Sequence, residues 1–239
     1  MRRGTVQRIA SAVSALPDDP DTEIERASLL ALYRAFASDP ETAVEELEDM
    51  AAMAPDDAMV LQRLSHAQRI ARSYGPAADT AQQAVQLRPD LPFLQAWAGM
   101  SLIRTRKYEL AAVHLKQASS RDLGFASIHS LYSEALQRMD QPEEALGQIH
   151  RALDLAPLEV DYALRIARIL EHLNRPDESI AHLVPVVEAE RAPAKLFILL
   201  IDLLEKTGRS SDAREMAAEA LRRSPDHPAL AELADRHAA

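Results

Sequence analysis

The chain has 239 residues, of which 47% are hydrophobic, 27% are charged and 4% are aromatic, and its formal net charge is −10. This acidity disfavours nucleic acid and anionic lipid as the main partners, because both are negatively charged. Cysteine is absent, which excludes disulfides, thiolate catalysis and cysteine-ligated metals. Good helix formers dominate and no alternating β-branched runs occur, so the composition predicts an all-α protein.

The N-terminal segment is basic although the whole chain is acidic. Residues 1–17 contain three arginines and no acidic residue, and their apolar residues have helical spacing: Val6, Ile9, Val13 and Leu16. We expect residues 1–23 to form an amphipathic helix that caps the helices that follow. The alternatives are a transit peptide and contact of residues 1–17 with a lipid surface, whereas Arg8 interrupts any signal-peptide core.

From residue 24 onward the sequence repeats with a period of 34 residues. Three columns of the repeat are mostly small: Ala43, Ala77, Ala111, Ala145, Ser179 and Ala213; Met50, Ala84, Ala118, Ala152, Val186 and Ala220; and Ala31, Ser65, Gly99, Ser133, Ala167 and Ile201. A fourth column is apolar: Leu30, Leu64, Ala98, Tyr132, Ile166 and Leu200. Columns that share one register indicate internal repeats, and small columns let paired helices approach closely.

Each period predicts a helix, a short polar break and a second helix. Asp39 before Pro40, and Asp140 near Pro142, are typical of an N-cap followed by proline in the first turn. A fifth column ends the second helix with a proline: Pro55, Pro89, Pro157 and Pro225. After the last period, the spacing of Leu230, Leu233 and Ala234 predicts a final capping helix.

These columns resemble the tetratricopeptide repeat, a 34-residue helix–turn–helix. The resemblance implies a right-handed α-solenoid of six repeats at residues 24–57, 58–91, 92–125, 126–159, 160–193 and 194–227, with residues 228–239 as the C-terminal cap. The repeats are degenerate, because the family's tryptophan and tyrosine slots hold other residues and only Gly99 keeps its glycine. Another α-solenoid is the alternative fold.

Two irregularities interrupt the pattern. Pro185 falls inside the second helix of the fifth repeat, where it removes a backbone hydrogen bond and should kink the helix. Between the third and fourth repeats the closing proline is missing and SSRDLGF stands in its place. We expect a looser joint there.

The resemblance implies that the first helices line a concave groove, and the functional information is expected on their less repetitive face. Helical spacing places Ser28 and Ala35 on this face of the first repeat, with Arg34 on the opposite, core face. In all repeats together, the residues predicted to bind a partner are Met59, Arg63, His66, Arg69, Phe93, Trp97, Met100, Arg104, Arg138, Arg165 and Arg168. Tryptophan and arginine are common interface anchors, and methionine adapts to varied partners. The competing interpretation packs Trp97 against the next repeat and pairs the arginines with neighbouring acids.

No catalytic or metal-binding motif is present in the sequence. The histidines are scattered, and glycine-rich phosphate loops and GxSxG are absent. We therefore expect a non-catalytic binding scaffold without cofactors. Its partner would be a protein or peptide with apolar anchors and acidic residues or a carboxylate.

Three further expectations concern the setting of this scaffold. The alternative function is an accessory or substrate-recruiting subunit of an enzyme or of a membrane-associated assembly. Self-association through Leu29, Leu32 and Phe36 is a further possibility. The expected location is the cytoplasm, with the periplasm and a membrane-peripheral location as alternatives.

Overall fold

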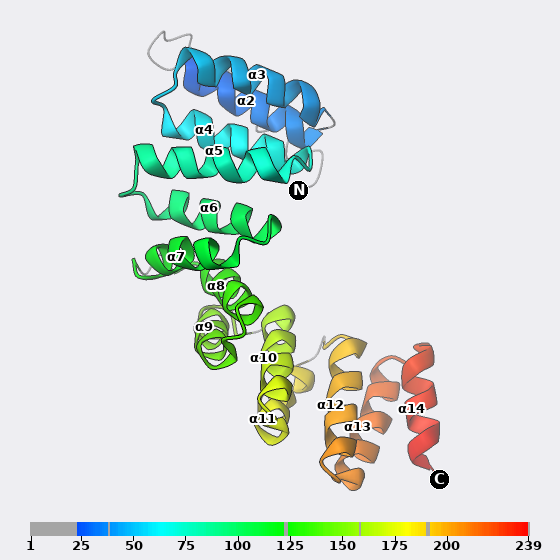
Figure 1. The fold of residues 1–239 in the computed structure, drawn as a ribbon. Helices are drawn as coiled ribbons and strands as arrows, with labels where there is room; N and C mark the ends of the chain where they lie inside the picture. The colour runs from blue at the N-terminus through cyan, green and yellow to red at the C-terminus, as the bar shows by residue number, and fades with distance from the viewer. Residues whose placement is uncertain (1–22, 38, 122–123, 158, 190–191, 239) are drawn as a thin grey trace. The chain divides into compact units, whose positions relative to one another are not determined.

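A computed structural model describes residues 23–37, 39–121, 124–157, 159–189 and 192–238. The predicted N-terminal helix of residues 1–23 lies almost wholly outside these ranges. The described part is all-α, as the composition predicts (Figure 1). Its helices are α2 (Glu23–Ala37), α3 (Pro40–Met53), α4 (Ala58–Ile70), α5 (Tyr74–Leu87), α6 (Pro92–Arg104), α7 (Tyr108–Ser119), α8 (Ala126–Arg138), α9 (Pro142–Leu155), α10 (Val160–His172), α11 (Pro176–Glu188), α12 (Ala194–Lys206), α13 (Ser210–Arg223) and α14 (Pro228–Ala238).

The helices follow the predicted period. Helices α4, α6, α8, α10, α12 and α14 begin at residues 58, 92, 126, 160, 194 and 228, a constant step of 34 residues. Each of the first five is followed, after a short turn, by a second helix that packs against it, and this order fits a solenoid of tetratricopeptide-repeat type. The division into six repeats with terminal caps stays a prediction, and the helix positions agree with it.

The chain divides into two compact units, Met1–Leu123 and Gly124–Ala239. The first contains α2 to α7, and its first helices contact one another, α2 against α4 and α4 against α6. The second contains α8 to α14, in which consecutive helices pack and α12 also contacts α14. The boundary between the units falls in the joint where the closing proline is missing.

The small columns occupy the helix contacts, as predicted. All six members of the column from Ala43 to Ala213 are at most 1% exposed. Gly99 shows why one position must remain glycine, because a Cβ there would lie 2.5 Å from Cγ of the buried Leu115 on α7. A methyl group at this point would collide with the core of the α6–α7 pair.

The turns inside the helix pairs share one backbone feature. The second residue after the first helix has positive φ in five turns: Arg72 (62°), Arg106 (61°), Asp140 (58°), Asn174 (55°) and Gly208 (76°). In each turn two N–H groups bond back to the helix; Lys107 N donates to Leu102 O at 3.0 Å and Arg106 N to Ile103 O at 3.1 Å. This is the Schellman ending, which satisfies the last carbonyls of the helix.

Of the two N-caps predicted from the sequence, the structure confirms Asp39 and contradicts Asp140. The Asp39 carboxylate accepts a hydrogen bond from Thr42 N at 3.2 Å, with Pro40 in the first turn of α3. The prediction for Asp140 is wrong, because Gln141 is the N-cap of α9 and Asp140 adopts the left-handed conformation of the preceding turn. Pro185 lies inside α11, which continues to Glu188.

The predicted helix face of the first repeat needs correction. Ser28 and Ala35, expected on the open face of α2, are buried, whereas Arg34, expected in the core, is exposed and paired with Glu46. The reason is that α2 contacts both α3 and α4, so two of its faces are covered. Within the described residues, no helix has the length and apolarity that a membrane span requires.

Candidate functional site

The first unit carries an aromatic stack across its first helices. Phe36 of α2 contacts His66 of α4 edge-on with ring centroids 4.9 Å apart, and His66 contacts Trp97 of α6 at 4.3 Å. Two arginines lie on aromatic rings beside it, Arg69 over Trp97 and Arg104 over Tyr74. We call these six residues, Phe36, His66, Arg69, Tyr74, Trp97 and Arg104, the aromatic–arginine surface.

Trp97 is both a packing residue and part of this surface. Its indole Nε1 donates to Ser65 Oγ at 3.0 Å, and Ser65 Oγ donates to Ala77 O at 2.7 Å. The ring also packs against the core that α4, α5 and α6 share. The competing interpretation from the sequence packs Trp97 against the next repeat, whereas the structure packs it against the preceding one, on α4 and α5. Trp97 is only partly buried, and the Arg69 guanidinium lies over its ring.

His66 is held in its neutral form at neutral pH. Burial, and secondarily the nearby Arg69 guanidinium, lower the pKa of His66 to about 4. A neutral imidazole between two aromatic rings adds no charge to the surface. The positive charge here therefore comes from the arginines.

Arg69 and Arg104 lack acidic partners among the residues that the structure describes. The guanidinium of Arg69 lies 5.2 Å from the Trp97 ring, and its buried Nε has no hydrogen-bond partner. Burial lowers the pKa of Arg69, with the Arg104 charge as a smaller cause. Arg104 lies 4.6 Å from the Tyr74 ring and donates to the Tyr74 hydroxyl at 3.0 Å. An anionic ligand could satisfy both cations.

The placement of Arg63 on an open face is wrong. Its side chain is only 6% exposed, and it donates to Ser28 Oγ at 2.7 Å and to the Glu25 carboxylate at 3.4 Å. A buried cation is stable only when paired, and the neighbouring helix α2 supplies the acid. Arg63 therefore joins α4 to α2.

The other residues predicted in this unit lie on α4 and α6, the helices that carry His66 and Trp97. Met59 of α4 and Met100 of α6 are partly buried, and Phe93, at the start of α6, is 39% exposed. Leu32, expected to support self-association, packs partly against the core of α2, α3 and α4. A binding role for these residues stays a prediction.

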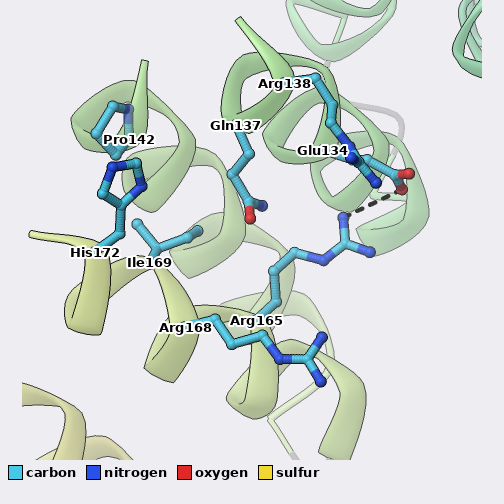
Figure 2. A pocket seen from close by; sticks show the side chains of 8 residues that line it. All are labelled: Glu134, Gln137, Arg138, Pro142, Arg165, Arg168, Ile169 and His172. Carbon is cyan, nitrogen blue, oxygen red and sulfur yellow. Dashed lines mark hydrogen bonds and ion pairs between the residues drawn. The ribbon is translucent and has the colours of Figure 1, made fainter. Parts of the chain in front are cut away.

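In the second unit the structure forms a pocket of about 320 Å³, which we call the α8–α10 pocket (Figure 2). Three of the predicted residues, Arg138, Arg165 and Arg168, line it. The remaining lining residues were not among the predicted binding residues: Glu134, Gln137, Pro142, Ile169 and His172. In the view of Figure 2 the guanidinium groups lie toward one side of the pocket, and Pro142, Ile169 and His172 toward the other.

Arg165 is the fixed arginine of this pocket. It donates to Ser130 O at 2.7 Å, and the same nitrogen lies 3.5 Å from Glu134 Oε2. Both contacts reach from α10 to α8. They hold the guanidinium in place through Nη1. Its other terminal nitrogen, Nη2, forms neither of these two contacts.

Arg138 and Arg168 are exposed and form no hydrogen bond or ion pair with any residue in the described ranges. Arg138 is the last residue of α8, and Arg168 lies in the third turn of α10. His172 lies 3.9 Å from Asp140 by its Nε2, at the edge of the pocket. The pocket can therefore offer several unsatisfied donors to an anion.

A second hollow, of about 290 Å³, lies in the first unit between the start of α6 and the end of α7. Its charged lining residues, Asp90 and Arg121, have opposite signs, and Asp90 is already paired with Arg88 at 2.8 Å. The described lining of this hollow therefore carries one charge of each sign, and Arg121 is its only arginine, whereas three arginines line the α8–α10 pocket. Among the described residues there is also no cluster of three or more His, Asp or Glu side chains that could hold a metal ion.

In the aromatic–arginine surface, Tyr74 is a residue that sequence reasoning missed. It stands at the start of α5, in a segment interpreted only as a break between helices. Its contact with Arg104, 30 residues away, crosses from one helix pair to the next. Only the packing of the helices reveals this pairing.

Comparisons with known proteins agree with this architecture. A family model described as tetratricopeptide repeat matches residues 133–183. No curated protein matches the sequence significantly.

Several solved structures are similar to the chain. MamA from Desulfovibrio magneticus RS-1 is 22% identical, with a TM-score of 0.64 over 72% of this chain and 95% of that one. PilF from Pseudomonas aeruginosa is 17% identical, with a TM-score of 0.67 over 90% and 98% of the two chains. YrrB, described as a TPR protein with an unusual peptide-binding site, is 19% identical, with a TM-score of 0.64 over 81% and 99%. At these identities the likeness shows the fold.

Proposed function

We propose that this chain, a tetratricopeptide-repeat protein by its fold, is a non-catalytic scaffold that binds a peptide segment of a partner protein on its first helices. One observation carries the proposal. In a chain of net charge −10, the first helices present four arginines without a carboxylate partner among the described residues: Arg69, Arg104, Arg138 and Arg168.

The pairing of other cations makes this observation informative. Arg175, Lys195 and Lys206 all reach acids on neighbouring helices. Acidic side chains are therefore within reach of other cations on first helices, whereas Arg69 and Arg104 lie on aromatic rings instead. A surface that keeps arginine next to accessible aromatic rings is suited to a partner that brings its own negative charge.

The chemistry of the ligand follows from the same residues. Trp97 and Phe93 offer apolar contact, and Arg69 and Arg104 offer charge-assisted hydrogen bonds. A peptide with an apolar anchor and acidic residues or a terminal carboxylate fits both. YrrB, with its described peptide-binding site, has the same fold, which supports a peptide as the class of ligand.

The test uses peptides selected from a random display library on the full-length chain. We expect enriched peptides to combine aromatic or aliphatic residues with Asp and Glu. Arg69→Glu and Arg104→Glu should each weaken the best peptide about tenfold or more, because charge-assisted hydrogen bonds are lost and replaced by repulsion. Lys116→Glu on the exposed face of α7 is the control, since it changes the net charge equally on a second helix.

Equal affinity of all three variants would contradict the proposed surface. Affinity purification from cells adds a second readout: a single co-purified enzyme whose activity depends on the chain would instead favour the accessory-subunit function. Sizing chromatography at several concentrations tests self-association, and cell fractionation tests the cytoplasmic location that we include in the proposal.

A further inference from the structure

We propose that the α8–α10 pocket binds a phosphoryl group, so that the scaffold recognises a phosphorylated side chain of its partner. This inference rests on the proposed function, since it assumes a peptide ligand. It assigns phosphate recognition to the second unit. Peptide binding on the aromatic–arginine surface of the first unit does not depend on it.

The charge of the pocket matches a dianion. Its lining includes three arginines and one carboxylate, Glu134, which lies 3.5 Å from Arg165. This ion pair leaves two arginines, Arg138 and Arg168, without compensation in the described part of the chain. A phosphorylated Ser, Thr or Tyr carries about −1.5 to −2 charges at neutral pH, whereas a carboxylate carries −1. A single phosphoryl group can therefore neutralise both cations, whereas a single carboxylate neutralises only one.

The donor geometry also favours phosphate. Guanidinium groups bind phosphate oxygens in a bidentate fork, and a phosphoryl group has three terminal oxygens to share among several arginines. Arg165 is fixed by Ser130 O, so it provides one preorganised donor at no further ordering cost. Arg138 and Arg168 are exposed and can adjust to the bound group. One fixed guanidinium group, that of Arg165, and two adjustable ones, those of Arg138 and Arg168, suit a tetrahedral anion.

The size and walls of the pocket suit a phosphorylated side chain. A volume of about 320 Å³ exceeds the space that a terminal carboxylate alone needs. Pro142 and the buried Ile169 form an apolar wall opposite the arginines, as Figure 2 shows. The carbon stem or ring of the ligand side chain could lie against this wall while its phosphoryl group meets the guanidinium groups.

The experiment compares degenerate peptide pools by fluorescence polarisation on the full-length chain. The probes are labelled pools with a central phosphoserine, phosphothreonine or phosphotyrosine, and the same pools without phosphate. All carry amidated C termini, so that no terminal carboxylate is present. A further unphosphorylated pool keeps a free C terminus.

We expect at least one phosphorylated pool to bind tenfold or more tightly than its unphosphorylated counterpart. Arg138→Gln and Arg168→Gln should each remove about tenfold of this advantage, since each deletes a charge-assisted contact. Arg151→Gln, at an exposed arginine of α9 that does not line the pocket, removes the same charge and should have no effect. Circular dichroism checks the folding of all three variants.

Three results would overturn the inference. The first is equal binding of phosphorylated and unphosphorylated pools. The second is an equal loss of affinity in Arg138→Gln, Arg168→Gln and Arg151→Gln. The third is a preference for the free C terminus over phosphate, which would assign the pocket to a carboxylate. The proposed function is judged separately, by unphosphorylated peptides and by Arg69→Glu and Arg104→Glu in the first unit.

Discussion

Arg106 adopts a backbone conformation that disfavours a side chain. Its φ is 61°, at the second position after α6, where helices commonly end in glycine. The equivalent residues in the other turns are Arg72, Asp140, Asn174 and Gly208. Asparagine, aspartate and glycine tolerate this conformation best, and arginine tolerates it poorly. The two arginine turns therefore store strain that the other three partly avoid.

Replacing Arg106 with glycine should stabilise the protein. Arg106 is exposed and lies outside both candidate sites, so the change removes backbone strain without removing a contact of the core. We expect a gain of about 1 kcal/mol in the free energy of unfolding, measured by urea denaturation. Arg151→Gly, in the middle of α9, should instead destabilise by about 1 kcal/mol. A loss of stability in Arg106→Gly would contradict the strain argument.

Sequence reasoning succeeded at residues whose role repeats along the chain. The small columns are buried as predicted except at Met50, which is partly buried, because the helix pairs make the same close contact. The left-handed turn column escaped notice although Asp140, Asn174 and Gly208 stand in register, since two arginines precede them. A column of residues that tolerate positive φ is thus a usable signal for the turn of such repeats.

At the scale of the element, α4 is the helix whose faces are most fully engaged. It contacts α2, α3, α5 and α6, and this explains why Arg63 is buried and why His66 lies between two aromatic rings. A helical projection of one segment assumes one covered face and one open face. It therefore misplaces residues where a neighbouring first helix covers the second face.

The position of His66 predicts a specific pH dependence of stability. Its pKa is about 4 in the folded chain, whereas an unperturbed histidine has a pKa of 6.5. Between these values the unfolded chain binds the proton and the folded chain does not, so stability falls as pH decreases from 6.5 toward 4. The shift corresponds to at most about 3 kcal/mol, and we expect about 1–2 kcal/mol because His66 remains partly accessible.

The measurement compares the wild type with His66→Gln in urea denaturation at several pH values. The variant should lose less stability than the wild type between pH 6.5 and about 4, because glutamine does not titrate. Other acidic groups contribute equally to both proteins and cancel in the difference. If the free energy of unfolding changed with pH in parallel for the two proteins, the pKa of His66 would not be lowered in the folded chain.

At the scale of the whole molecule, the missing closing proline coincides with the boundary between the two compact units. Helix α7 ends at Ser119, Arg121 is exposed, and the second unit begins at Gly124. Backbone that few contacts cross is a preferred site for proteolysis. The expectation of a looser joint can therefore be tested directly.

Limited trypsin digestion should cut after Arg121 before it cuts within the helices of either unit. Mass spectrometry should then find a fragment that begins at Asp122. Arg121→Gln removes the cleavage site, and the variant should persist longer under the same digestion. Early cleavage inside α4 or α10, with residue 121 intact, would mean that the joint is not the weakest point of the chain.

The sequence by itself determined the helical class, the period, the helix ends at proline and the small contact columns. These features follow from local preferences and from one contact repeated in every unit, so periodicity records them. Only the tertiary structure decided which arginines remain available. Arg63 meets Glu25, which lies 38 residues earlier, whereas Arg69 meets the Trp97 ring and no acid among the described residues. Charge pairing between helices depends on side-chain directions across two repeats, and neither composition nor period contains that information.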